Sequence, residues 1–116
     1  MPTAEITTTV RTVTDGVRVI DVHGEITAFA EDALHRAHEE ASAGAVRAVI
    51  LNFSGLDYMN SGGIGLLVTT LIRAQRAGHK LLAYGLSSHY REIFSLTRLD
   101  EAIEILPDEE AAVAAA

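Results

Sequence analysis

The spacing of hydrophobic residues changes several times along the chain, and each change predicts a new element. From Glu5 to Thr14 the chain is rich in Thr and Val, which is typical of a strand with one exposed face. Asp15-Gly16 is a turn signal and residues 17–22 have the composition of a second strand, so we expect a hairpin. Between residues 28 and 43 the period becomes helical, and Gly44 is expected to end that helix.

A strand, a helix and a further strand are expected in the middle of the chain. Residues 46–53 contain a continuous apolar run, which favours a central strand buried on both faces. A helix from about residue 62 to residue 77 should follow, with Thr70 facing water. The residues expected on its core face are Ile64, Leu67, Val68, Leu71 and Ala74. Residues 80–84 form the next strand, so this unit predicts a parallel crossover.

The remaining pattern completes one domain over residues 1–116, with a core at about 5–106. A helix is expected at residues 88–97 and a weak strand at 103–106. Pro107 with the acidic residues after it favours a last helix in the tail, residues 107–116. The predicted fold class is α/β, with a single mixed sheet of about five strands, an N-terminal antiparallel hairpin and about four helices.

Composition narrows the classes of partner. The net charge of −7 argues against a surface for nucleic acids or anionic membranes, because phosphates would be repelled. The absence of cysteine excludes disulfides and thiolate metal sites. The start, MPTAEITTTV, lacks the features of a signal peptide, and no apolar run approaches the roughly 18 residues of a membrane span. We therefore expect a cytoplasmic protein.

The stretch DYMNSGGIG, residues 57–65, carries the main candidate chemistry. Ser61 is expected at the N-cap of the following helix, a structural role worth about 1 kcal/mol. Gly62 and Gly63 in the first turn each cost of order 1 kcal/mol relative to Ala, which a cap alone does not require. Such glycines let another molecule approach the backbone, and a helix N-terminus stabilises a phosphate on Ser61. The residues thus leave a helix cap and a modification site as alternatives.

Enzymatic interpretations have less support. The pattern G-x-S-x-G is absent because Met59 stands two residues before Ser61, and no P-loop sequence exists. His35 and His38 are three residues apart on a helix and could share a metal, but a solvated helix face is favoured over that reading. We expect no catalytic residue, no metal and no cofactor.

Three segments resemble one known family. LNFSGLDYMNSGGIGLL, Leu51 to Leu67, is similar to the signature of the STAS domain, specifically of the anti-sigma factor antagonist (anti-anti-sigma factor) family, whose pattern is roughly L-D-L-S-x-[LV]-x-[FY]-[ILM]-D-S-[ST]-G-[LI]-G. HGEIT, His23 to Thr27, is similar to the family's G-E-[LI]-D. LLAYGLSSHYREIFSLTRLDEAIEI is similar to its last strand and third helix. The resemblance covers nearly the whole chain.

The resemblance implies a small bacterial regulator of transcription. Such proteins bind an anti-sigma factor, usually a serine kinase, and so release a sigma factor. The kinase phosphorylates the motif serine, here Ser61, and ends binding, whereas a PP2C-type phosphatase restores it. Most stand-alone members are monomers. The residues implied in partner binding are Asp57, Met59, Asn60, Gly62, Gly63 and Leu66.

The chain departs from the family pattern at three positions. Asn60 and Asn52 stand where the family usually has Asp, and Gly62 replaces a second Ser or Thr. Asn keeps the shape of Asp but lacks its charge. A STAS module that acts without phosphorylation, as a scaffold or sensor in a signalling assembly, therefore stays open as the alternative.

Overall fold

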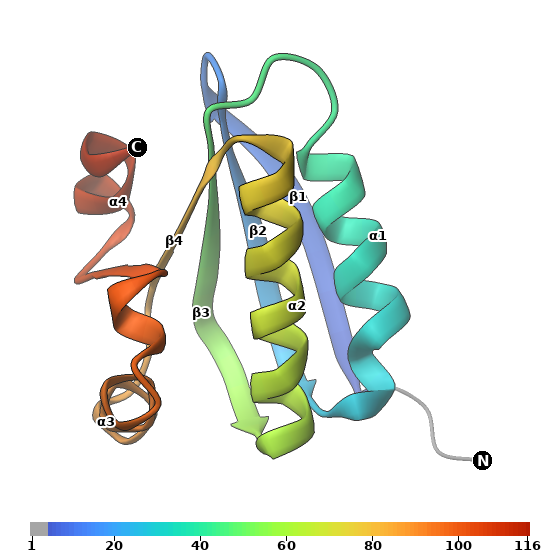
Figure 1. Cartoon of the computed structure of the whole chain (residues 1–116), viewed down its shortest axis with the longest axis vertical. Helices are drawn as coiled ribbons and strands as arrows, with labels where there is room; N and C mark the ends of the chain where they lie inside the picture. Colours follow the sequence, from blue (N-terminus) through green and yellow to red (C-terminus); the bar gives the residue numbers. More distant parts are fainter. Residues whose placement is uncertain (1–4) are drawn as a thin grey trace.

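The predicted hairpin and parallel strands form one mixed sheet in the computed structural model, which describes residues 5–116 (Figure 1). Residues 1–4, part of the stretch in which no signal peptide was expected, lie outside the described residues. The strands are β1 (Ile6–Thr14), β2 (Val17–Ile26), β3 (Ala48–Met59), β4 (Lys80–Tyr84) and β5 (Glu104–Leu106). The helices are α1 (Glu31–Ala41), α2 (Ser61–Ala77), α3 (Ser88–Leu96) and α4 (Glu109–Ala115), with 3-10 turns η1 (Ala28–Ala30) and η2 (Leu99–Glu101).

The sheet has the order β1-β2-β3-β4-β5. Strands β1 and β2 are antiparallel, and all other neighbours are parallel. The predicted fold class is therefore confirmed. Residues 48–51 of the central strand are buried, as their unbroken apolar run predicts.

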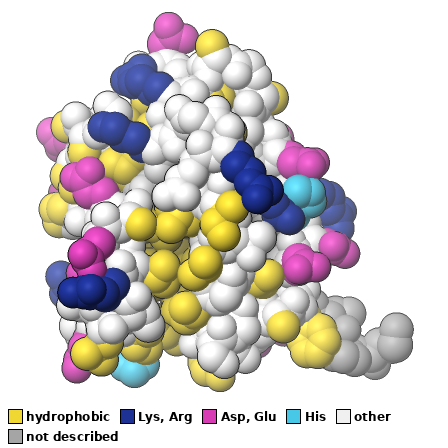
Figure 2. All heavy atoms as spheres, in the orientation of Figure 1, with side chains coloured by type: hydrophobic (Ala, Val, Ile, Leu, Met, Phe, Trp, Pro, Cys, Tyr) yellow, Lys and Arg dark blue, Asp and Glu magenta, His cyan; other side chains and the backbone are white. Residues whose placement is uncertain are grey.

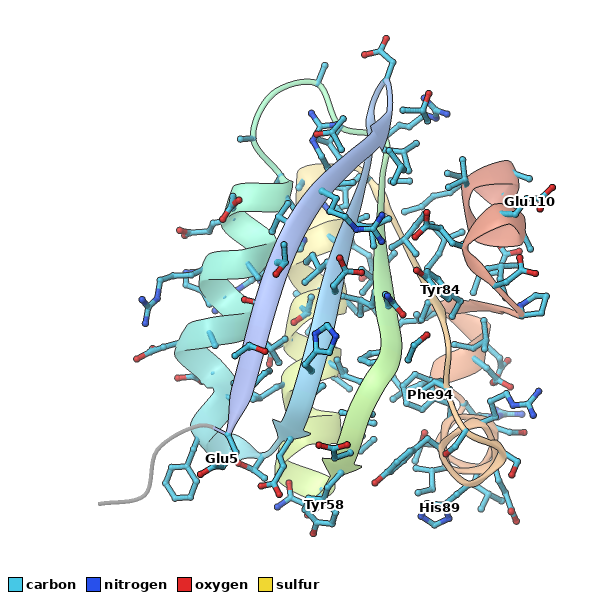
Figure 3. All side chains as sticks on the ribbon, turned by 180° about the vertical axis from the view of Figure 1, so that it is seen from behind. Glu5, Tyr58, Tyr84, His89, Phe94 and Glu110 are labelled. Carbon is cyan, nitrogen blue, oxygen red and sulfur yellow. The ribbon has the colours of Figure 1, made fainter. Side chains whose placement is uncertain are left out.

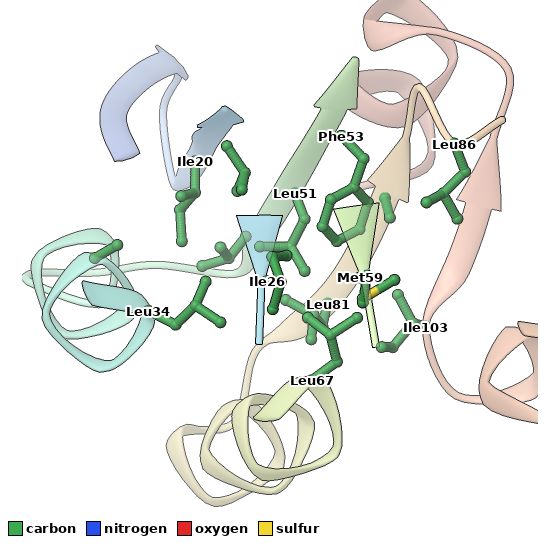
Figure 4. Packing of buried hydrophobic residues seen from close by; sticks show 14 of the residues in the cluster. Ile20, Ile26, Leu34, Leu51, Phe53, Met59, Leu67, Leu81, Leu86 and Ile103 are labelled. Atoms are coloured by element: carbon green, nitrogen blue, oxygen red, sulfur yellow. The ribbon is translucent and has the colours of Figure 1, made fainter. Parts of the chain in front are cut away.

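The two faces of the sheet are covered differently. Helices α1 and α2 lie side by side over one face (Figure 1), and the larger core cluster fills the space between them and the strands (Figure 4). Ile20, Leu51 and Leu67 belong to this cluster. On the other face, Ala112 of α4 packs with a smaller cluster that includes Ile50.

The first helix is shorter than predicted. Residues 28–30 form the 3-10 turn η1, and α1 ends at Ala41, three residues before the expected Gly44. The Ser42 hydroxyl donates a hydrogen bond to the His38 carbonyl (2.7 Å), which satisfies an acceptor of the last helical turn. Gly44, with a φ of 85°, belongs to the following loop.

Strand β3 is longer than predicted, because it extends to Met59 instead of ending at Phe53. Strand β2 also continues, to Ile26, and residues 23–26 pair with residues 55–59 across two irregularities in register. Residues 54–59, which were assigned to no element, are therefore strand. As a result, the position of Ser61 is set by the sheet.

The buried face of α2 is rotated by about one position from the prediction. Val68, expected in the core, is 38% exposed, whereas Thr70, expected in water, is buried. Burial of Thr70 is tolerated because its hydroxyl donates to the Leu66 carbonyl (2.9 Å). Leu66, expected on the outer side of the helix, is half-buried against the larger core cluster. Hydrophobic side chains gather in the middle of the face that carries α2 (Figure 2).

Candidate functional site

Ser61 is the first residue of α2 and is exposed. The N-cap is Asn60, not Ser61 as expected, because extended backbone at Asn60 lets its Oδ1 accept from the Gly63 N–H (3.0 Å). The Ser61 and Gly62 N–H groups stand in the first turn, where no intrahelical acceptor exists. The Ser61 hydroxyl is therefore not needed as the cap of α2 and lies beside the positive end of its dipole.

Gly62 and Gly63 serve internal packing, which corrects the expectation that they open the backbone to a partner. A Cβ on Gly63 would overlap the carbonyl oxygen of Ile26, and Gly63 is buried. A Cβ on Gly62 would lie 3.1 Å from the Ala28 nitrogen, so the Ser or Thr usual in the resembled family would fit tightly here. Only Gly65, of these three, would place a Cβ in open space. The first turn of α2 thus lies directly against the end of β2.

The segment before Ser61 is held from two sides. The Asn60 N–H donates to the Ile26 carbonyl (3.3 Å), and the Met59 N–H donates to the Tyr90 hydroxyl (2.9 Å). Tyr90 of α3 was not among the predicted site residues. Its contact with Met59 joins segments 31 residues apart, and no local motif signals such a contact. Tyr90 therefore positions the start of α2 from another helix.

The side chains that are exposed around Ser61 differ from those expected. Met59 is 5% exposed and packs in the core, so together with Gly63 it is absent from the surface proposed from the resemblance. Tyr58 is 47% exposed instead and projects from the end of β3 (Figure 3). Phe29, next to the Ala28 that Gly62 approaches, is 60% exposed. Successive side chains of a strand point to opposite faces. A prediction that extended β3 to Met59 would therefore have placed Tyr58 on the surface in place of Met59.

The chain from the start of β3 to the middle of α2 carries no Lys or Arg. Residues 48–72 and residues 19–35 contain neither Lys nor Arg, whereas Glu25 and the exposed Asp57 are acidic. A negative group added to Ser61 would therefore find its support in backbone N–H groups and the helix dipole, not in a cation from these segments.

The comparison with known families decides the identity of the domain. The family profile of the STAS domain matches residues 8–112, nearly the entire chain. The chain belongs to the STAS domain family. The resemblance carried by the three sequence segments is confirmed.

Solved structures similar to this STAS domain include regulators and a transport-related protein. An anti-sigma factor antagonist from Mycobacterium paratuberculosis is 29% identical, with a TM-score of 0.75 and coverage of 98% of this chain and 97% of that one. SpoIIAA from Bacillus in its phosphorylated form is 24% identical, with a TM-score of 0.71 and coverage of 95% and 100%. A sulfate transporter family protein from Wolinella succinogenes is 18% identical, with a TM-score of 0.77 and coverage of 90% and 87%. The last two support the fold alone.

One departure of this STAS domain from the family pattern, Asn52, has a local cause away from Ser61. The Asn52 amide donates to Asp21 Oδ1 (2.7 Å), and Arg11 Nε donates to Asp21 Oδ2 (2.6 Å). The Arg11 guanidinium holds the pKa of Asp21 below its usual value. An aspartate at position 52 would set a second carboxylate against Asp21, which is unfavourable. Asn52 thus belongs to a polar network on the sheet.

His38 is buried in this STAS domain, which corrects the expectation of a solvated helix face. It is 4% exposed, His79 is 7% exposed, and their Nε2 atoms are 3.0 Å apart. Burial lowers the pKa of His38 to about 4, and burial also lowers the pKa of His79. His35 instead contacts Glu39 (2.9 Å) near the surface. Both buried imidazoles are therefore neutral at pH 7.

Because His38 is buried as a neutral imidazole, we expect the folded domain to lose stability in mild acid. The pKa of His38 is about 6.5 in the unfolded chain and about 4 in the folded one, so the unfolded state binds more protons between these values. The contribution is complete above pH ~6.5, and about 3 kcal/mol of it should be lost as the pH falls to ~4. Urea unfolding at a series of pH values would measure this, and His38→Gln should flatten the profile. An unchanged slope in that variant would contradict the assignment to His38.

Residues 5–116 contain no cluster of three or more histidine, aspartate or glutamate side chains able to hold a metal ion. Within the same residues, none of the helices combines the length and apolar character that crossing a membrane demands.

Proposed function

We propose that this STAS domain is an anti-sigma factor antagonist, which binds an anti-sigma factor and so releases a sigma factor, and that phosphorylation of Ser61 ends the binding. The observation that carries the proposal is the position of Ser61, exposed at the first residue of α2 while Asn60 performs the capping. A kinase can reach the hydroxyl, and its modification leaves the cap intact. The domain has no catalytic role in this proposal.

A phosphate on Ser61 would change the surface without refolding the domain. It adds about −1.5 to −2 charges at neutral pH. The N-terminus of α2 stabilises this charge, but residues 48–72 and 19–35 supply no Lys or Arg to neutralise it. A partner that covers Ser61 in the unmodified state would have to desolvate the phosphate, which opposes binding.

The contact surface in this proposal combines exposed and half-buried residues around the serine. Phe29 and Tyr58 supply apolar area, and Asp57 and Asn60 supply polar contacts beside Ser61. Aromatic side chains at the centre of an interface commonly contribute much of its binding energy. The partner is a serine-protein kinase acting as anti-sigma factor, and a PP2C-type phosphatase reverses the modification. The domain acts as a monomer in the cytoplasm.

One similar protein supports this function, and a second one shares the fold. The Mycobacterium paratuberculosis protein, 29% identical over almost the full length, is described as an anti-sigma factor antagonist. SpoIIAA, solved in a phosphorylated form, demonstrates that a protein of this fold can carry the modification.

Mass spectrometry of the protein recovered from its native cells tests the proposal. We expect a fraction with one added phosphate, located at Ser61 and absent from cells that carry Ser61→Ala. The alternative, a non-phosphorylated scaffold or sensor, is favoured by Asn60 in place of the family's Asp. Absence of phosphate in every growth condition would select the alternative, as would phosphate found only at other serines.

A further inference from the structure

The outer face of α2 carries a regular row of residues, separate from the row that packs in the core. Its members follow one another at intervals of four, three and four residues, and all are exposed: Ser61, Gly65, Val68 and Ile72. With 3.6 residues per turn, these positions lie within about 60° of one another around the helix axis. They are on the side of α2 away from the buried Leu67 and Ala74. We call this row the outer strip of α2.

The outer strip carries no charge. From Tyr58 to Ile72 the sequence contains no Asp, Glu, Lys or Arg, whereas the outer face of a surface helix normally carries charged residues. Val68 is 38% exposed and Ile72 is 42% exposed. Thr69, next to the strip, donates its hydroxyl to the Gly65 carbonyl (3.2 Å), so its polar group is already used within the helix. Apolar side chains therefore dominate this part of the surface (Figure 2).

Gly65 has no internal reason to be glycine. A Cβ at this position would meet open space, unlike one on Gly62 or Gly63, and the backbone of Gly65 does not have a positive φ. Glycine in place of alanine inside a helix costs about 1 kcal/mol. The missing side chain lets another molecule approach the backbone of α2 between Ser61 and Val68. A contact outside the domain would explain the cost.

We propose that the outer strip continues the partner surface around Ser61, and that an amphipathic helix of the anti-sigma factor packs along it. This inference rests on the proposed function. Intervals of four and three residues are those at which one helix presents side chains to another that lies along it. From Ser61 to Ile72 the strip is about 16 Å long, which matches about three turns of a partner helix.

The size of a stable interface favours such a continuation. A specific interface buries about 800 Å² and roughly 20–30 residues on each partner. The surface proposed around the serine, with Phe29, Asp57, Tyr58 and Asn60, is smaller than this. Because the outer strip begins at Ser61 and is uncharged, the contact can extend along it without burying an unpaired charge.

The far end of the strip defines the chemistry of the partner helix further. Arg76 follows Ile72 by four residues, so it lies on the same face of α2, and it is exposed. The helix that fits this surface has an apolar stripe and an acidic residue at the end that faces Arg76. A phosphate on Ser61 would stand at the opposite end of the same contact, where the partner helix would have to desolvate it.

Photo-crosslinking in the native cells tests the inference. A benzophenone amino acid replaces Ile72 in one version of the full chain and Tyr58 in a second. A third version carries it at Ala43, which is exposed in the loop after α1, at the other end of the molecule (Figure 1). We expect the Ile72 and Tyr58 versions to be crosslinked to one protein, identified by mass spectrometry as an anti-sigma factor, and the Ala43 version not to be.

The outcomes separate this inference from the proposed function. An anti-sigma factor crosslinked from Tyr58 but not from Ile72 would overturn the inference and leave the proposed function in place. Its absence from both positions would remove the proposed function and the inference with it. A product at Ile72 that contains a second copy of the chain, or any protein other than the anti-sigma factor, would also overturn the inference.

Calorimetric titration with the crosslinked anti-sigma factor, purified, gives a second readout. Ile72→Gln should lower the affinity about tenfold, because it replaces an apolar contact with a polar amide. Gly65→Ala should also lower it about tenfold although Ala is the better helix former, because the new methyl group occupies space needed by the partner helix.

Ala77→Gln is the matched control, since Ala77 is exposed on α2 but lies outside the strip. It should bind as wild type does. Circular dichroism checks that each variant is folded before it is titrated. The inference is overturned if Ile72→Gln or Gly65→Ala binds as tightly as wild type, or if Ala77→Gln loses as much affinity as they do.

Discussion

Ser61→Asp is expected to weaken binding of the anti-sigma factor at least about a hundredfold, while Ser61→Ala keeps the affinity of the unmodified protein. A cost of about 3 kcal/mol suffices for this ratio. The cost arises because a carboxylate at the centre of the contact must be desolvated, and residues 48–72 and 19–35 provide no Lys or Arg to pair with it. Calorimetric titration of each variant with the purified partner measures the effect.

Stability must be unaffected for this comparison to be valid, and the structure predicts that it is. Ser61 is exposed, and an acidic residue in the first turn of a helix is favourable. Ala43→Asp controls for the added charge, because Ala43 is exposed in the loop after α1, at the other end of the molecule. Equal affinities of Ser61→Asp and Ser61→Ala would rule out the switch, and a similar loss in Ala43→Asp would assign the effect to net charge.

The architecture could be predicted because short segments of the sequence indicate each element. The Asp15-Gly16 turn between two strand-like segments predicts the hairpin, and the apolar run in residues 48–51 predicts a central strand. The boundaries were less accurate. Strand β3 reaches Met59 because the end of β2 pairs with it, and such pairing between distant segments leaves no periodic pattern in either one.

The sequence indicated a candidate site around Ser61, but it did not indicate which residue caps α2 or which side chains are exposed there. The serine and the helix after it were placed together correctly, whereas the cap proved to be Asn60. Asn and Ser are almost equally good N-caps, so residue type alone could not choose between neighbours. The exposure of Phe29 and the support from Tyr90 depend on which segments meet in space.

The histidine pair and the role of Asn52 were beyond sequence reasoning for the same reason. His38 and His79 are 41 residues apart with no spacing that links them, and the helical period around His38 was read as a solvated face. Asn52 faces Asp21 across two neighbouring strands, a contact visible only once the register is known. A single sequence does not show which polar side chains of the site form hydrogen bonds with residues of another element.

Gly63→Ala is expected to destabilise the fold by about 3 kcal/mol. The new Cβ would overlap the Ile26 carbonyl oxygen and crowd the Met59 side chain, so the first turn of α2 must move away from the end of β2. Backbone on one side and the core on the other leave little room for relaxation. Urea unfolding measures the loss.

Gly65→Ala provides the matched control in the same helix. Its Cβ would meet open space, so the helix preference of Ala over Gly acts alone and should stabilise the domain by about 0.5–1 kcal/mol. The opposite signs expected two residues apart separate a packing requirement from helix propensity. If Gly63→Ala were instead neutral or stabilising, α2 would not start against β2 as described. The placement of Ser61, which depends on that contact, would then have to be revised with it.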